Sequence, residues 1–222
     1  MSHVRQQFTA ELEQLRLQVE LMGVRVDQNL ERMREVLRSG DEAVAAAALA
    51  ADDDIDHMNI SLTERCYDLL ARESPVASDL RFVVSVLRVL SELERIGDLS
   101  LRVDKEVDAY EFLRSDEVAF DVLQAMADEA LERYRTALRA WATMDLDLAI
   151  GLARKNRTMD LFYERLMAEI VRYDGPDPVR VAIAVTAVGR AIERIGDHAS
   201  IIGARLQYLI TGDPDHLAAE VR

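Results

Sequence analysis

Two identical pentapeptides place pairs of carboxylates at a spacing that suits a cation. The sequence ERIGD at residues 94–98 returns unchanged at residues 193–197, 99 positions later. On an α-helix, residues i and i+4 stack on one face about 6 Å apart, so each pentapeptide holds its two acids side by side. The two pairs are Glu94 with Asp98 and Glu193 with Asp197. Because neighbouring anions repel each other and a cation between them offsets the repulsion, the repeat predicts an internal duplication with one acidic site per half.

The composition is typical of a protein made of long helices. Of 222 residues, 50% are hydrophobic and only 5% are aromatic, with 9 Gly and 4 Pro. No strand pattern competes with the helical periodicity. The length allows one large or two small domains, and the 99-residue offset favours two units of about 110 residues each.

Charge and cysteine content exclude several classes of function. A net charge of −14 argues against nucleic acid as a partner, because a phosphate backbone needs a basic face. Cys66 is the only cysteine, which rules out an internal disulfide and a cysteine-based zinc site, and its spacing predicts that it packs as a small apolar residue. No signal peptide or membrane-spanning segment is apparent, so we expect a cytoplasmic protein without direct membrane insertion.

Apolar residues at steps of three and four predict six helices. Turn signals such as Ser39-Gly40-Asp41 and Ser74-Pro75 separate them. The expected helices span residues 4–37, 42–73, 77–113, 117–143, 145–172 and 178–210. Three long helices with short connections bury their apolar faces best as an antiparallel bundle. We therefore predict an all-α fold of two tandem three-helix bundles, residues 1–114 and 115–222; one merged six-helix bundle shows the same periodicity.

The second expected helix brings more carboxylates to the first pair. Asp52 and Asp56 repeat the i,i+4 spacing and lie about 20 residues before the bend at Pro75, while the 94–98 pentapeptide lies about 20 residues after it. Antiparallel helices place both groups about 30 Å from the bend, so Asp52, Asp56, Glu94 and Asp98 are expected to converge. A cluster of oxygens without His or Cys suits hard or oxophilic cations.

The second half repeats this arrangement less completely. Asp160 lies at a level similar to that of Glu193 and Asp197, but Asn156 stands where the first half has Asp52. An amide oxygen can bind a metal but carries no charge. The second cluster is therefore expected to bind metal more weakly.

Angular positions assign roles to the neighbours of the acids. Glu94 interrupts an apolar stripe, where an unpaired carboxylate is costly. Glu92 fits a solvated helix face, and His198 is expected at the surface rather than as a ligand. Arg95 and Arg194 point away from the carboxylate pairs and are expected to form ion pairs on the outer face.

These motifs resemble the PhoU family of phosphate-signalling regulators over nearly the whole chain. The residues that carry the resemblance are LERIGD at 93–98, IERIGD at 192–197, Asp79-Leu80-Arg81 and the acidic run at 52–56. The family is built as two tandem three-helix bundles with a repeated E(D)xxxD motif. The resemblance implies regulation of phosphate uptake and signalling together with the ABC phosphate transporter, through its ATPase, and a membrane sensor histidine kinase, restraining the phosphate-starvation response.

The resemblance also implies metal clusters and self-association. Family members bind iron or zinc through the acidic motifs, and a homodimer is expected, at the inner face of the membrane only through partners. The implied metal ligands are Asp52, Asp56, Glu94 and Asp98 for one cluster and Asp160, Glu193 and Asp197 for the other.

Two other functions stay open from the residues. One is a metal-independent helical adaptor whose acidic faces bind basic surfaces of a partner. The other, less favoured, is a carboxylate-bridged di-metal enzyme, although such sites use a Glu-x-x-His pair that this sequence lacks. The sequence contains no phosphate-binding P-loop and no nucleophile constellation, so no catalytic residue is expected.

Overall fold

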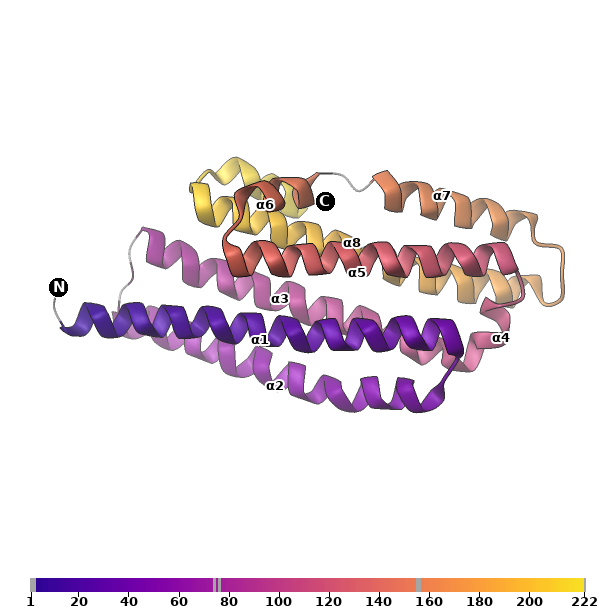
Figure 1. Ribbon diagram of the computed structural model, residues 1–222, viewed down its shortest axis with the longest axis horizontal. Helices are drawn as coiled ribbons and strands as arrows, with labels where there is room; N and C mark the ends of the chain where they lie inside the picture. Colours follow the sequence, from indigo (N-terminus) through magenta and orange to yellow (C-terminus); the bar gives the residue numbers. More distant parts are fainter. Residues whose placement is uncertain (1–2, 74, 76, 155–156, 222) are drawn as a thin grey trace.

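The computed structural model describes residues 3–73, 75, 77–154 and 157–221, and every regular element in these ranges is helical (Figure 1). The α-helices are α1 (His3–Ser39), α2 (Glu42–Glu73), α3 (Ser78–Asp104), α4 (Tyr110–Leu113), α5 (Glu117–Thr143), α6 (Leu146–Ala153), α7 (Arg157–Arg172) and α8 (Pro178–Thr211). Two 3₁₀ segments are η1 (Lys105–Ala109) and η2 (Pro214–Val221). The all-α prediction is confirmed.

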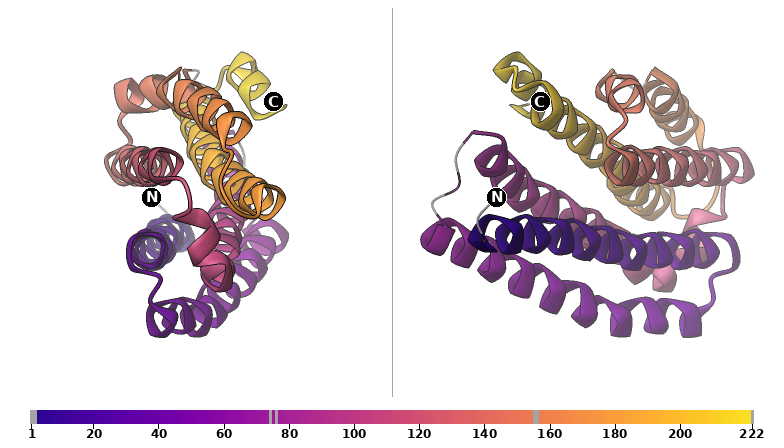
Figure 2. Two further views of the ribbon diagram at one scale, coloured as in Figure 1. Left: turned by 90° about the vertical axis from the view of Figure 1, so that its right-hand side faces the viewer. Right: turned by 60° about the vertical axis from the view of Figure 1, so that its left-hand side comes forward.

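The helices form two antiparallel bundles of three. Helices α1, α2 and α3 make the first bundle, and α5, α8 and the α6–α7 pair make the second (Figure 1). Helices α1, α3, α8 and α5 contact one another in a ring, while α2 and the α6–α7 pair lie on opposite outer sides (Figure 2). A single cluster of buried apolar side chains runs from Phe8 to Leu209, so the cores of the two bundles are continuous.

Aspartate residues cap the N-termini of three helices. The side chains of Asp41, Asp116 and Asp145 each accept hydrogen bonds from backbone N–H groups two or three residues ahead, at 2.8 to 3.3 Å. These bonds satisfy donors that have no partner within the helix. In the connection between α1 and α2, Gly40 has a φ of 68°, and the ring of Tyr110 leaves no space there for a side chain. The residue types in these connections therefore determine where the helices begin and end, as predicted.

Two of the expected helices are divided. The helix predicted for 145–172 is interrupted at Arg154, whose ψ of 147° is extended, and the guanidinium of Arg133 donates to the carbonyls of Leu152 and Arg154 there. The side chain of Arg133 in α5 thus replaces backbone hydrogen bonds that a continuous helix would make. The helix predicted for 77–113 ends at Asp104, and the chain continues through η1 and α4.

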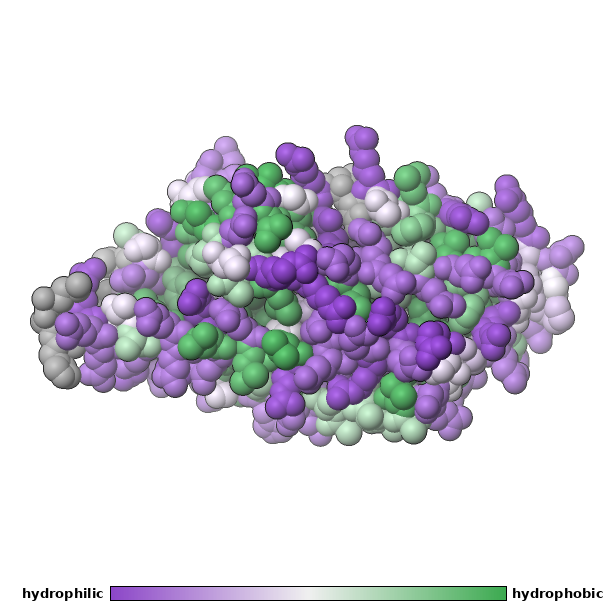
Figure 3. Space-filling view, in the orientation of Figure 1, coloured by the Kyte–Doolittle hydropathy of each residue, from purple (hydrophilic) through white to green (hydrophobic). Residues whose placement is uncertain are grey.

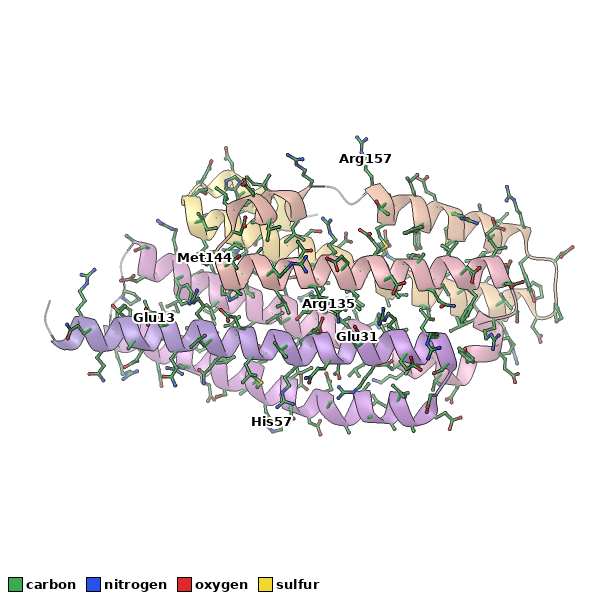
Figure 4. The ribbon with its side chains drawn as sticks, in the orientation of Figure 1. Glu13, Glu31, His57, Arg135, Met144 and Arg157 are labelled. Atoms are coloured by element: carbon green, nitrogen blue, oxygen red, sulfur yellow. The ribbon has the colours of Figure 1, made fainter. Side chains whose placement is uncertain are left out.

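Polar contacts also join the two bundles through α1 and α5. The fully buried Tyr134 donates its hydroxyl to the carbonyl of Gly23 at 2.7 Å. The guanidinium of Arg135 bonds to Asp27 at 2.8 Å and to Glu31, and Figure 4 shows it directed from α5 toward α1. A hydroxyl on a buried ring needs such a partner. The packing of one bundle on the other is thus fixed by directional bonds as well as by apolar contact.

The surface is dominated by charged side chains. Figure 3 shows hydrophilic residues over most of one face, with apolar residues in small separate groups. None of the described helices has the length and apolarity needed to cross a membrane. Cys66 is fully buried in the core, which confirms its predicted role as an apolar packing residue.

Candidate metal site

The first acidic cluster lies where α2 crosses Gly97 of α3. A Cβ atom at Gly97 would stand 3.6 Å from an oxygen of Asp52 and 3.9 Å from Ile55, which are ordinary contact distances. Gly97 therefore marks the contact between α2 and α3, but the space there would also admit an alanine. Asp52 and Glu94 are half-buried, whereas Asp56 and Asp98 are exposed.

Electrostatic coupling shows that the four carboxylates of this cluster are neighbours. Burial, together with the negative charges of Asp56 and Asp98, raises the pKa of Asp52 to about 6. Burial also raises the pKa of Glu94, with Asp98 and Asp56 adding to the effect. These shifts mean that keeping all four groups ionised together is unfavourable. The carboxylates of Asp52, Asp56, Glu94 and Asp98 thus lie near enough to influence one another electrostatically.

The carboxylates of the first cluster are not positioned to coordinate a metal ion together. Across residues 3–73, 77–154 and 157–221, no three side chains of His, Cys, Asp or Glu stand close enough together to hold a metal ion. Carboxylates that repel one another separate when no cation lies between them. The oxygen donors fit a hard or oxophilic cation, and side-chain rotation is needed to bring them onto it.

The second cluster contains the same acids with cations among them. Burial raises the pKa of Asp197, and the charge of Asp160 raises it further, so these two acids are neighbours as predicted. Arg190 forms a hydrogen-bonded ion pair with Glu193. The neighbouring His198, Arg190 and Arg133 act in the opposite direction and lower the pKa of Asp197. Asn156, expected as the weak ligand, lies outside the described residues.

Arg133 is the side chain that most distinguishes the second cluster. It donates to the carbonyl of Arg154 at 2.9 Å and to the hydroxyl of Ser200 at 3.0 Å, and it also bonds to the carbonyl of Leu152. In the first half, Asn29 donates to the carbonyl of Ala48 at 3.5 Å. Asn29 and Ala48 each lie 104 positions before Arg133 and Leu152. The duplication thus keeps the bond and replaces a neutral amide with a cation.

Two predictions about the neighbours of the pentapeptides are wrong. Glu92 is fully buried rather than solvated, and His198 is 7% exposed rather than on the surface. The Nδ1 atom of His198 lies 2.6 Å from Glu92, and Arg88 lies 2.9 Å from the other oxygen of the same carboxylate. Helix α3 packs on α1 and α2 on one side and on α8 on the other, so it has two buried faces. Val89, Glu92 and Ile96 are all buried and follow one another at steps of three and four, which is the sequence pattern of this second buried face.

The predicted outer-face ion pairs of Arg95 and Arg194 are also absent from the described part of the chain. Arg95 is exposed, and Arg194 lines a groove between α3 and α8. Asp104 is a further buried acid, which no sequence pattern marks. It is 1% exposed, and neither of its carboxylate oxygens has a hydrogen-bond partner among the described residues. Burial raises the pKa of Asp104 to about 7, against a lowering by the nearby Arg32.

Comparison with known proteins tests the resemblance that the motifs suggest. The family model described as "PhoU domain" matches this chain twice, at residues 19–112 and 123–206. The chain belongs to the PhoU family. Each match contains one acidic cluster, so the duplicated pentapeptides lie at corresponding places in two PhoU domains.

Relatives cover almost the whole chain. The phosphate-specific transport system accessory protein PhoU homolog of Pseudomonas putida is 32% identical over 214 residues, which are 95% of this chain and 83% of the relative. The accessory protein PhoU of Escherichia coli (strain K12) is 30% identical over 95% of this chain and 88% of its own length. The names of these relatives place the family with phosphate-specific transport.

Solved PhoU structures have the same fold. The crystal structure of PhoU from Pseudomonas aeruginosa matches with a TM-score of 0.85 and 31% identity, over 93% of this chain and all of the other. The phosphate transport system regulatory protein PhoU from Streptococcus pneumoniae matches with a TM-score of 0.83 and 28% identity, over 93% of this chain and 98% of the other. Both matches support the prediction of tandem helical bundles.

Proposed function

We propose that this chain is a cytoplasmic regulator of phosphate uptake and signalling. In this role it couples the ATPase of an ABC phosphate transporter to a membrane sensor histidine kinase and restrains the phosphate-starvation response when phosphate is plentiful. The observation that carries the proposal is the match of two PhoU domains, each holding an acidic cluster. The protein acts by binding rather than by catalysis, and it reaches the inner face of the membrane through its partners.

Iron or zinc at the first acidic cluster forms part of this proposal. The donors are the oxygens of Asp52, Asp56, Glu94 and Asp98. The raised pKa of Asp52 supports the assignment, because a bound cation would offset both the burial of this charge and the repulsion from Asp56 and Asp98 that raise the pKa. A bound cation would lock α2 to α3 and hold the outer acidic surface in one shape. The second cluster, with Asp160, Glu193 and Asp197, binds metal more weakly because Arg190 and Arg133 already supply positive charge.

Deletion of the gene tests the regulatory role. In phosphate-rich medium the deletion strain should express phosphate-starvation genes at high level, and the wild-type gene on a plasmid should restore repression. The Glu94→Gln, Asp98→Asn double variant should restore repression only in part if metal supports docking. Unchanged expression in the deletion strain, with no second PhoU gene present, contradicts the assignment. A homodimer is expected, and sedimentation of the purified protein measures it.

A metal-independent adaptor is the second candidate. It is favoured by the lack of a ready-made metal-binding group among the described side chains and by the arginines in the second cluster. In that case the double variant above restores full repression, and protein purified without chelator contains no stoichiometric metal. The same measurements therefore separate the two candidates.

A further inference from the structure

A narrow groove with a basic rim runs between α3 and α8, where the two halves of the molecule meet. Its volume is about 260 Å³, and three of its six lining residues are arginines. The floor consists of small or apolar side chains. The lining residues are Leu99 and Arg102 of α3 with Ala187, Arg190, Ala191 and Arg194 of α8.

Two of these arginines lack an acidic partner in the described part of the chain. Arg190 bonds to Glu193, but neither Arg102 nor Arg194 takes part in an ion pair with any described residue. Both also line the neighbouring groove that contains Glu94 and Asp98. Although these carboxylates are close, no ion pair joins them to Arg102 or Arg194. The two guanidinium groups are therefore available to an external anion.

We propose that this groove binds inorganic phosphate between Arg102 and Arg194. The planar guanidinium group presents paired N–H donors that match two oxygens of a phosphate group, and such charge-assisted bonds are roughly twice as strong as neutral ones. A space of about 260 Å³ holds a small oxyanion with water but not a helix of a partner protein. The choice of phosphate among small oxyanions rests on the proposed function.

The place of the groove gives such binding a consequence. Arg102 comes from the first half and Arg194 from the second, so one bound anion contacts both PhoU domains. It would fix α3 against α8 at the seam between them. Because the whole chain carries a net charge of −14, an anion needs a local group of cations such as the three arginines of this groove. Phosphate in the groove would report phosphate supply directly to the regulator.

Titration of the purified full chain with inorganic phosphate tests the proposal. Metal is first removed on a chelating resin, so that phosphate cannot bind through a cation at Glu94 and Asp98. Ionic strength is held constant with chloride, and binding is followed by amide chemical shifts in nuclear magnetic resonance spectra. Saturable shifts are expected for residues around the groove. Parallel titrations use sulfate and ATP, to separate free phosphate from other oxyanions and from a phosphate group carried by a nucleotide.

Variants locate the site. Arg102→Ala and Arg194→Ala should each weaken phosphate binding roughly tenfold, because each removes one charge-assisted contact. Arg102→Lys keeps the charge but loses the paired geometry and should bind with intermediate affinity. Arg165 of α7 is exposed and lines neither this groove nor the neighbouring one, so Arg165→Ala is the matched control and should bind as the wild type does. All of these side chains lie on the surface, so the variants should fold.

Three results would overturn the proposal. They are the absence of saturable binding, equal weakening by Arg165→Ala, and binding of sulfate or ATP as tight as that of phosphate. None of them bears on the gene-deletion test, because a regulator that does not bind phosphate still represses the starvation genes. Failure of this inference and failure of the proposed function are thus distinguishable.

Discussion

The two halves of this protein keep the same pentapeptide but surround it with different charges. Around the first copy the chain adds acids; at the matching positions of the second half it has neutral residues. The pairs are Asp52 and Asn156, Glu92 and Ala191, and Asp104 and Gly203. Around the second copy the chain instead adds a cation, because Arg133 replaces Asn29.

This difference shows that a duplicated motif does not by itself define a duplicated site. Carboxylates at i,i+4 repel each other in both halves, and each half needs a source of positive charge. In the second half Arg190 forms an ion pair with Glu193, whereas among the described residues no ion pair is formed by Glu94 or Asp98, although Arg95 and His198 lower the pKa of Glu94. The charge environment, rather than the motif, thus separates a proposed metal site from an internally neutralised one.

Glu92→Ala should have the largest effect on stability. It gives the first half the residue that the second half has at the matching position, Ala191. The change removes the carboxylate that pairs with His198 and Arg88 between α3 and α8, and it leaves Arg88 with Glu220 alone. We expect a loss of about 3–5 kcal/mol in the free energy of unfolding. Urea denaturation measures it. Glu132→Ala, which breaks the exposed pair with Arg139, is the control and should cost less than about 1 kcal/mol. A cost equally small for Glu92→Ala would contradict the role of this buried pair.

Asp104→Asn should make the protein more stable at high pH. Burial raises the folded-state pKa of Asp104 to about 7 from the 3.8 of an unperturbed aspartate. The folded state therefore binds the proton more tightly, so the contribution to stability is complete below pH 3.8 and is lost as the pH rises through 7. At pH 8 the variant should exceed the wild type by up to roughly 4 kcal/mol. Melting temperatures between pH 5 and 8 test this, and parallel profiles for both proteins would contradict it.

Arg133→Ala should destabilise the second half by about 2–3 kcal/mol, because it removes hydrogen bonds from a charged group at the break between α6 and α7. Asn29→Ala, at the matching place, should cost less, because its bond at 3.5 Å is longer and uncharged. Amide hydrogen exchange should show the loss of protection near Ser200 in the Arg133 variant alone. If both variants cost the same, the cation has no special role.

The Glu94→Gln, Asp98→Asn double variant should have the smallest effect on folding. Without metal it should be as stable as the wild type or more stable, because like-charge repulsion at i,i+4 costs about 0.2–0.5 kcal/mol per pair. Thermal melts in chelator, with circular dichroism for helix content, measure it. A large loss of stability would show that these acids are structural ion-pair partners.

The sequence allowed the fold and the first cluster to be predicted because both depend on periodicity. Helical spacing and the level of Asp52 relative to Glu94 follow from 1.5 Å of rise per residue. Glu92, His198 and Arg133 could not be placed in the same way. Their roles depend on contacts between helices 67 to 106 residues apart, and a single helix pattern does not show which of its faces a neighbour covers.

The metal content of variants in the two halves tests the proposed metal site most directly. Protein purified without chelator is compared as wild type, as Glu94→Gln with Asp98→Asn, and as Glu193→Gln with Asp197→Asn, with iron and zinc measured by elemental analysis. We predict that the first double variant loses most of its metal and that the second retains most of it. Loss of metal only in the second double variant, or metal content unchanged in both, would contradict the proposal that the carboxylates of the first half form the metal site.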